Sequence, residues 1–234
     1  MNEFNQILPV SALGEDARVA FYKKTYTYLA FAVLLFVVVE YLFLQVDFIV
    51  NIGKQMIQGW TWLLVLGGFM FVTNYAERLA MGSKDKTVHH AALFLYVVAE
   101  AFIFVPLIFI ATQISEANQS DVLTQAAVMT IALFGGLSAI VFITKKDFSF
   151  LKSIITIGSF IALGLIIAGT LFGGFNLGLW FSVGMVALAA GSILYQTSNM
   201  IHRYEEEQYV AASLGLFASL MLLFWYIVSI FMSE

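Results

Sequence analysis

The first long apolar stretch of the sequence, TYTYLAFAVLLFVVVEYLFLQV at residues 25–46, decides the class of fold. It contains a single charged side chain, Glu40. A helix of about 20 mostly apolar residues crosses the ~30 Å hydrocarbon core of a bilayer. The stretch is continuously apolar rather than alternating, which excludes a strand of a membrane barrel. It therefore predicts a transmembrane helix.

The composition of the whole chain agrees with a membrane protein. Of 234 residues, 61% are apolar and only 11% are charged, whereas a soluble domain has about 25% charged residues. So little polar surface cannot cover a globule in water, which excludes a soluble enzyme, a disordered protein and a nucleic-acid-binding protein. The chain has no cysteine, which excludes disulfides and cysteine-ligated metals.

Further apolar stretches of similar length follow the first, separated by short connections. The sequence therefore predicts an all-α integral membrane protein, a seven-transmembrane-helix bundle at residues 25–234. Residues 1–24 are predicted to form a polar cytoplasmic tail that is locally disordered, with a short surface helix at 10–20 as the alternative. The six further predicted spans are residues 60–80, 88–112, 122–143, 150–172, 177–199 and 209–231.

The basic residues predict how the bundle is oriented. Short cytoplasmic loops of membrane proteins are enriched in Lys and Arg. With the N-terminus in the cytoplasm, ten of the eleven basic residues fall on the inside and only Lys54 falls outside. We therefore expect the C-terminus outside, in a multi-pass protein of the cell inner membrane. The inside residues are Arg18, Lys23, Lys24, Arg78, Lys84, Lys86, Lys145, Lys146, Lys152 and Arg203.

Two carboxylates inside predicted spans are the main functional signal. Glu40 lies about 22 Å along the first span and Glu100 about 18 Å along the third, at 1.5 Å per residue. Both spans run outward, so the two side chains can share one depth, and no Lys or Arg lies there to pair with them. Ionisable groups in hydrocarbon are costly and mark candidate ion or proton sites. The alternative is two hydrogen-bonded packing residues.

The remaining polar residues give weaker signals. Glu77 and Arg78 close the second span and are expected to anchor it at the cytoplasmic face, although Arg78 can instead reach into the bundle. Asn199 belongs to a polar cluster that ends the sixth span. Adjacent histidines at 89 and 90 point in different directions from a helix, which is poor geometry for a metal. No hydrolase, nucleotide-binding or metalloprotease motif is present, so we expect no enzyme, no cofactor and no metal.

Three segments carry a family resemblance. They are TKKDFSFL at residues 144–151, ILYQTSNMIH at 193–202 and YVAASLGLF at 209–217. Together they resemble the Bax inhibitor family, the transmembrane Bax-inhibitor-motif proteins, and most closely its bacterial YccA-like branch. The resemblance extends over most of the chain, from about residue 21 to 231. It implies a seven-helix fold in which the last helix lies near the centre.

The resemblance also implies where a family site should lie. Many members carry an intramembrane pair of aspartates, taken as a pH-sensing latch on a calcium leak. The matching positions here are Gln196 and Ser219, which cannot ionise, so that latch cannot operate in this chain. The YccA-like branch also has serine at the second position. That branch is associated with the membrane-anchored AAA protease FtsH as substrate and modulator.

Two functions therefore remain open from the sequence. In the first, the protein regulates a membrane-anchored AAA protease and offers residues 1–24 as a flexible handle. In the second, it is a leak channel or transporter for calcium or protons that uses Glu40 and Glu100. Its surroundings in either case are the lipid bilayer, and nucleic acid is not an expected partner.

The predicted orientation can be tested directly. A reporter fused after Glu234 should behave as periplasmic, because the basic residues place the even-numbered connections and the N-terminus inside. The same reporter fused after Lys146 should behave as cytoplasmic and serves as the control. A cytoplasmic signal from the C-terminal fusion would contradict the predicted number of spans.

Overall fold

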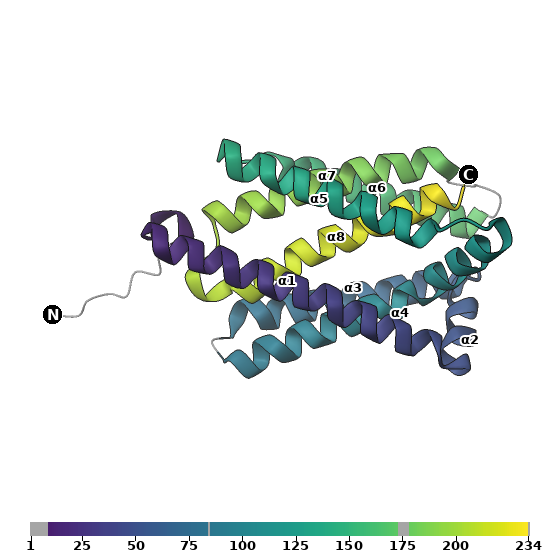
Figure 1. The fold of residues 1–234 in the computed structure, drawn as a ribbon. Coiled ribbons are helices and arrows are strands. Elements are labelled where there is room, and N and C mark those ends of the chain that lie inside the picture. Colours follow the sequence, from purple (N-terminus) through teal and green to yellow (C-terminus); the bar gives the residue numbers. More distant parts are fainter. Residues whose placement is uncertain (1–8, 84, 173–177, 234) are drawn as a thin grey trace.

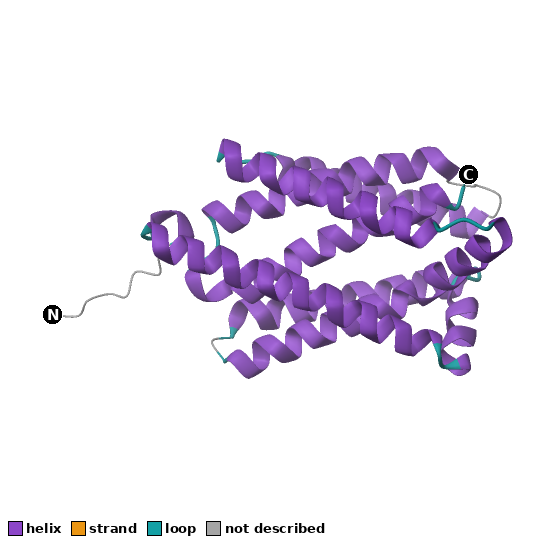
Figure 2. Cartoon of the chain, viewed as in Figure 1, coloured by secondary structure: helices purple, strands orange, loops and turns teal. Residues whose placement is uncertain are grey.

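The computed structural model describes residues 9–83, 85–172 and 178–233, and nearly all of this chain is helical (Figures 1 and 2). Long runs of apolar residues form helices because a helix satisfies its own backbone hydrogen bonds. The helices are α1 (Glu15–Leu44), α2 (Asp47–Met56), α3 (Trp60–Gly82), α4 (Lys86–Asn118), α5 (Val122–Thr144), α6 (Leu151–Phe172), α7 (Gly178–His202) and α8 (Tyr209–Phe231), with short 3₁₀ helices at Val10–Ala12 and Glu206–Gln208.

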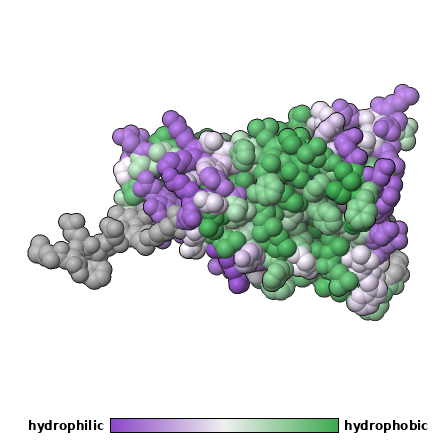
Figure 3. Space-filling view, turned by 90° about the horizontal axis from the view of Figure 1, so that it is seen from below, coloured by the Kyte–Doolittle hydropathy of each residue, from purple (hydrophilic) through white to green (hydrophobic). Residues whose placement is uncertain are grey.

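The surface of the molecule matches a bilayer. Figure 3 shows a broad apolar band across the middle of one face, with hydrophilic side chains toward both ends. Six helices of the described chain are long and apolar enough to cross a membrane, and the bent pair α2 and α3 raises the number to as many as seven. The structure thus supports an all-helical, multi-pass membrane protein, with the predicted seven spans as the upper count.

Helix α8 is the central element of the bundle. It packs against α1, α3, α4, α5 and α7, and buried residues line it on every side, including Leu214, Leu216 and Phe217. In Figure 1 it runs diagonally through the molecule, and its last residues lie at the end of the bundle away from the start of α1. Small residues such as Ala211, Ala212 and Gly215 let its neighbours approach closely.

The first helix begins earlier than the predicted first span. Helix α1 begins at Glu15, within the segment that the sequence analysis assigned to the tail. Val10 is fully buried and its N–H donates to the Tyr204 carbonyl at 2.8 Å. Phe21 is buried as well. Residues 9–24 therefore pack onto the bundle, and residues 1–8 of the predicted tail lie outside the described part of the chain.

Helix α2 lies in a connection for which no element was predicted. Its residues Val50, Gly53 and Met56 are buried, whereas Phe48 is exposed, so the helix is amphipathic. Gly53 packs so closely on α4 that an added methyl group would lie 2.8 Å from Val105 Cγ1. Helix α2 is bent by 107° from α3. It covers the end of α4 instead of extending a span.

The opposite end of the bundle is held together by hydrogen bonds between connections. The Phe148 N–H donates to Ser198 Oγ at 2.9 Å, which ties the α5–α6 connection to α7. Hydrogen bonds from the side chain and backbone of Ser149 hold the pKa of the Asp147 carboxyl below its ordinary value. Lys24 and Lys86 line one shallow pocket at this end. The basic segments of the sequence therefore meet at one end of the molecule, as their alternation predicted.

Candidate intramembrane carboxylate site

The candidate site is built on the buried face of α4. Tyr96 and Glu100 are one turn apart on this face, and both are nearly completely buried. Glu100 is only 5% exposed, and its Oε2 atom has no hydrogen-bond partner among the described residues. Burying a polar group without a partner is costly, so such a group inside a membrane marks a candidate functional site. Glu100 is therefore a candidate functional residue.

A cavity of about 280 Å³ lies beside Glu100. Helices α3, α4, α6 and α8 line it, and the lining residues that carry polar atoms are Glu100, Tyr96, Tyr226, Trp62 and Trp225. The other described lining residues are apolar. Calcium takes six to eight oxygen ligands, which this lining does not supply. No group of three or more acidic or histidine side chains in the described chain can hold a metal ion.

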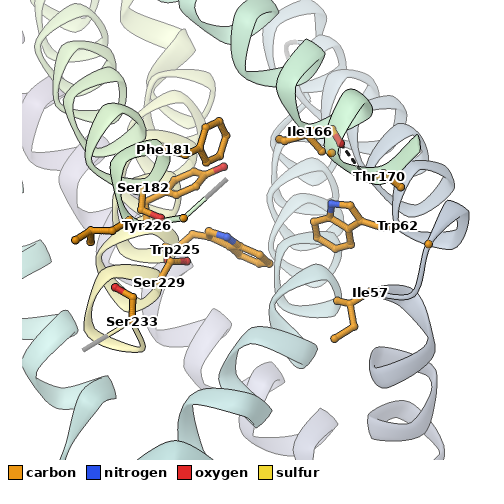
Figure 4. A pocket seen from close by; sticks show the side chains of 14 residues that line it. Ile57, Trp62, Ile166, Thr170, Phe181, Ser182, Trp225, Tyr226, Ser229 and Ser233 are labelled. Atoms are coloured by element: carbon orange, nitrogen blue, oxygen red, sulfur yellow. Dashed lines mark hydrogen bonds between the residues drawn. The ribbon is translucent and has the colours of Figure 1, made fainter. Parts of the chain in front are cut away.

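A wider vestibule of about 670 Å³ lies next to this cavity, toward the end of the bundle away from the basic residues (Figure 4). Hydroxyl groups of Thr170, Ser182, Ser229 and Ser233 line it together with aromatic rings. The vestibule and the cavity share four lining residues: Trp62, Ile166, Trp225 and Tyr226. The aromatic residues Trp62, Trp225 and Tyr226, called the aromatic wall below, thus lie between the polar vestibule and the cavity that Glu100 lines.

Glu40 occupies a different environment. It is 5% exposed on the buried stripe of α1 that also carries Phe36, and neither of its carboxyl oxygens has a hydrogen-bond partner in the described structure. It is not among the residues that line the Glu100 cavity. The structure therefore buries both predicted carboxylates but does not bring them to one cavity.

The three supporting polar residues lie toward the basic end of the bundle. Glu77 is half-buried on α3, and Arg78 is exposed. Burial, followed by the nearby Glu77 carboxyl and Tyr195, raises the pKa of Tyr204 to about 12. Asn199 is buried, and its carbonyl accepts the N–H groups of Arg203 and Tyr204 at 2.8 and 3.2 Å. These backbone bonds close the last turn of α7, whereas the Oδ1 atom of the Asn199 side chain has no partner within the described chain.

Gln196 and Ser219 face each other across the α7–α8 contact without a direct hydrogen bond in the described structure. The Ser219 hydroxyl instead bonds Ser192 Oγ at 2.8 Å and the Gly215 carbonyl at 2.9 Å. The Gln196 amide packs on Gly215, where an added methyl group would lie 2.9 Å from its Oε1 atom. Neutral polar groups therefore fill this contact.

Comparison with known proteins agrees with this architecture. A family model described as "Inhibitor of apoptosis-promoting Bax1" matches residues 18–234. The chain belongs to the Bax inhibitor family. The bacterial protein YccA and related membrane proteins are among its homologues.

Three relatives show the range of this family. An uncharacterized protein of Pseudomonas aeruginosa is 41% identical over 114 residues, which are 49% of this chain and 51% of that protein. The "Modulator of FtsH protease YccA" of Escherichia coli K12 is 33% identical over 114 residues, 49% of this chain and 52% of the relative. These matches span about half the length of the bacterial relatives. A "Golgi anti-apoptotic protein" of Vaccinia virus strain Lister is 27% identical over 233 residues, 98% of this chain and 92% of the relative.

Sequence reasoning missed the aromatic residues that line both the vestibule and the Glu100 cavity. Trp62 and Trp225 read as ordinary interfacial aromatic residues near span ends. Tyr96 had a usable signal, because it lies four residues before Glu100 and so shares its helix face. Ser192 had the same signal, one turn before Gln196. The wall itself joins residues far apart in the chain, which no local pattern reveals.

The neutral α7–α8 contact leads to a prediction about pH. The double substitution Gln196→Asp with Ser219→Asp should lower the apparent melting temperature relative to the parent, by more at about pH 8 than at about pH 5, because two like charges in a low-dielectric bundle repel. A loss of about 1 kcal/mol corresponds to roughly 2–4 °C for a domain of this size. The single variants Gln196→Asn and Ser219→Thr are neutral controls. An equal decrease in melting temperature at both pH values would contradict the interpretation that Gln196 and Ser219 keep the α7–α8 contact free of charge.

Proposed function

We propose that this Bax inhibitor family protein is a non-enzymatic, multi-pass protein of the inner membrane that passes protons through its helix bundle. The exchange site is Glu100. The observation that supports the proposal is an unpartnered carboxyl group that lines a cavity directly behind a polar vestibule. Intramembrane carboxylates facing a cavity are typical of proton relays.

The chemistry of the cavity favours a proton over calcium. A proton needs one basic oxygen and neighbours that can donate or accept a hydrogen bond, and Glu100, Tyr96 and Tyr226 supply these groups. Calcium needs several oxygen ligands at once. Gln196 and Ser219, which occupy the positions at which the resemblance places an acidic pair in many members, add no charge.

Further ionisable side chains lie between Glu100 and the basic end. Tyr96 lies within electrostatic range of both Glu100 and Glu77. Glu77 in turn lies within range of Tyr204, at the connection that follows α7. No hydrogen bond joins these four side chains in the described structure, so a proton that passes this way needs water molecules between them.

The proposal is tested by proton flux into proteoliposomes that contain a pH-sensitive dye and carry an imposed potassium diffusion potential. Glu100→Gln should reduce proton flux to the level of protein-free vesicles, because the amide keeps the shape of the side chain but cannot exchange the proton. Glu116→Gln, which removes an exposed carboxylate of the same helix, should leave the flux unchanged.

Calcium entry is measured in parallel with a calcium dye. Proton flux that survives Glu100→Gln would overturn the assigned site. Calcium flux that depends on Glu100, in the absence of proton flux, would support Glu100 as the site but contradict the proposal that protons are the transported ion.

A second function is favoured by the similarity to the "Modulator of FtsH protease YccA" of Escherichia coli K12. We propose as the alternative that this chain binds a membrane-anchored AAA protease through lipid-exposed helix faces. Helix α6 offers such a face, since Ala162 is its one buried residue among those described and Ile154, Ile157 and Phe160 are exposed. Residues 9–24 pack on the bundle and are not free to serve as a handle.

This alternative predicts co-purification with the protease from detergent-solubilised membranes. Replacing the exposed α6 residues Ile157 and Phe160 by Ala should weaken that co-purification, because the contact area is lost. Ile140→Ala with Ile143→Ala, on the exposed face of α5, is the matched control. Equal recovery of the protease with all three proteins, or none with the parent, would contradict the proposed binding face.

A further inference from the structure

The vestibule and the Glu100 cavity are neighbouring volumes that share four lining residues. They share Trp62 and Trp225, and these two indoles reach toward each other from α3 and α8 (Figure 4). Their ring centroids are 6.0 Å apart and their planes differ by 28°. This is the range of direct contact between aromatic rings. An apolar constriction of this kind can close a polar path by excluding water.

The packing around Trp225 on α8 differs from the packing around Trp62 on α3. Trp225 packs edge-on against Phe104 with centroids 4.9 Å apart, and α8 around it is the buried centre of the bundle. Trp62 is the third residue of α3, directly after the 107° bend from α2. The buried residues of α3 are Thr73, Ala76 and Ala80, all in its other half. The half of α3 that carries Trp62 packs on the core only through partly buried residues, which are Trp62, Val65, Leu66 and Phe69. It is therefore held less firmly than α8.

We infer that Trp62 and Trp225 form a barrier that controls access from the vestibule to Glu100, and that Trp62 is its movable side. Displacement of the first turns of α3 away from α8 separates the indoles and joins the two volumes. Water then reaches Glu100 from the vestibule. The inference rests on the proposed function, because the barrier matters only if Glu100 exchanges protons. The barrier itself can be tested without a proton-flux measurement.

The experiment uses the full chain in detergent and a water-soluble carbodiimide with glycine ethyl ester, which converts an accessible carboxyl group to an amide. Peptide mass spectrometry reports the modified fraction of Glu100. We expect low modification in the parent protein and a several-fold rise in Trp62→Ala, because the wall has lost its movable indole. Trp225→Ala should give a similar rise from the other side.

A matched control lies two residues away on the same helix. Trp60 is 69% exposed and is not among the residues that line either volume, so Trp60→Ala should leave Glu100 modification at the parent level. The buried Glu40 carboxyl should stay unmodified in every folded variant and so reports unfolding. The series Trp62→Phe, Trp62→Leu and Trp62→Ala keeps the test decisive if the smallest variant unfolds, since modification must rise as the side chain shrinks.

The outcomes separate the barrier from the proposed function. Modification of Glu100 that is equal in the Trp62 series and in Trp60→Ala overturns the barrier, even if Glu100→Gln abolishes proton flux. Modification that rises in the Trp62 series supports the barrier, and it does so even if proton flux proves independent of Glu100. In that case only the proposed function fails.

Discussion

The hydrocarbon interior of the bilayer offers no hydrogen-bond partner to the protein backbone, and every element of this structure follows from that constraint. Each buried N–H and C=O must be satisfied within the chain, so the apolar stretches become helices. The helices then pack through side-chain shape, because lipid is as apolar as leucine and gives little hydrophobic drive for association. Helix α8 meets this condition most fully: its small residues admit close neighbours and its large ones fill the spaces between them.

Polar side chains that lie inside the bundle without a hydrogen-bond partner are the most informative about function. Several hydroxyls inside the bundle have a local hydrogen-bond partner, as Thr130 does by donating to the Ala126 carbonyl at 2.7 Å. A carboxyl group has no such local solution on a helix, and Glu100 and Glu40 are left with unpartnered oxygens in the described chain. Only Glu100 lies beside an open volume, which separates a candidate exchange site from a carboxyl that is simply enclosed.

The α7–α8 contact of this Bax inhibitor family protein carries no charge. Neutral groups that pack and hydrogen bond occupy the two positions at which the resemblance places an acidic pair in many members. The two buried carboxylates lie instead on α1 and α4. The proposed proton exchange therefore takes place at Glu100 on α4 and not at the α7–α8 contact.

The sequence alone determined the helical class, the apolar stretches that form the spans and the alternation of basic residues, because each depends on local hydrophobicity and charge. Glu100 and Glu40 were also identifiable, since a charged residue inside a long apolar stretch needs no partner to be noticed. That the two carboxylates do not share a cavity could not be predicted. The depth of a residue along a helix follows from its number, whereas the rotation of the helix and the identity of its neighbours depend on packing. The same limit hid the contact of Gln196 with Gly215, the burial of Val10 against Tyr204 and the wall between Trp62 and Trp225. Each of these joins residues distant in the chain, and only the tertiary structure decides which distant helices meet.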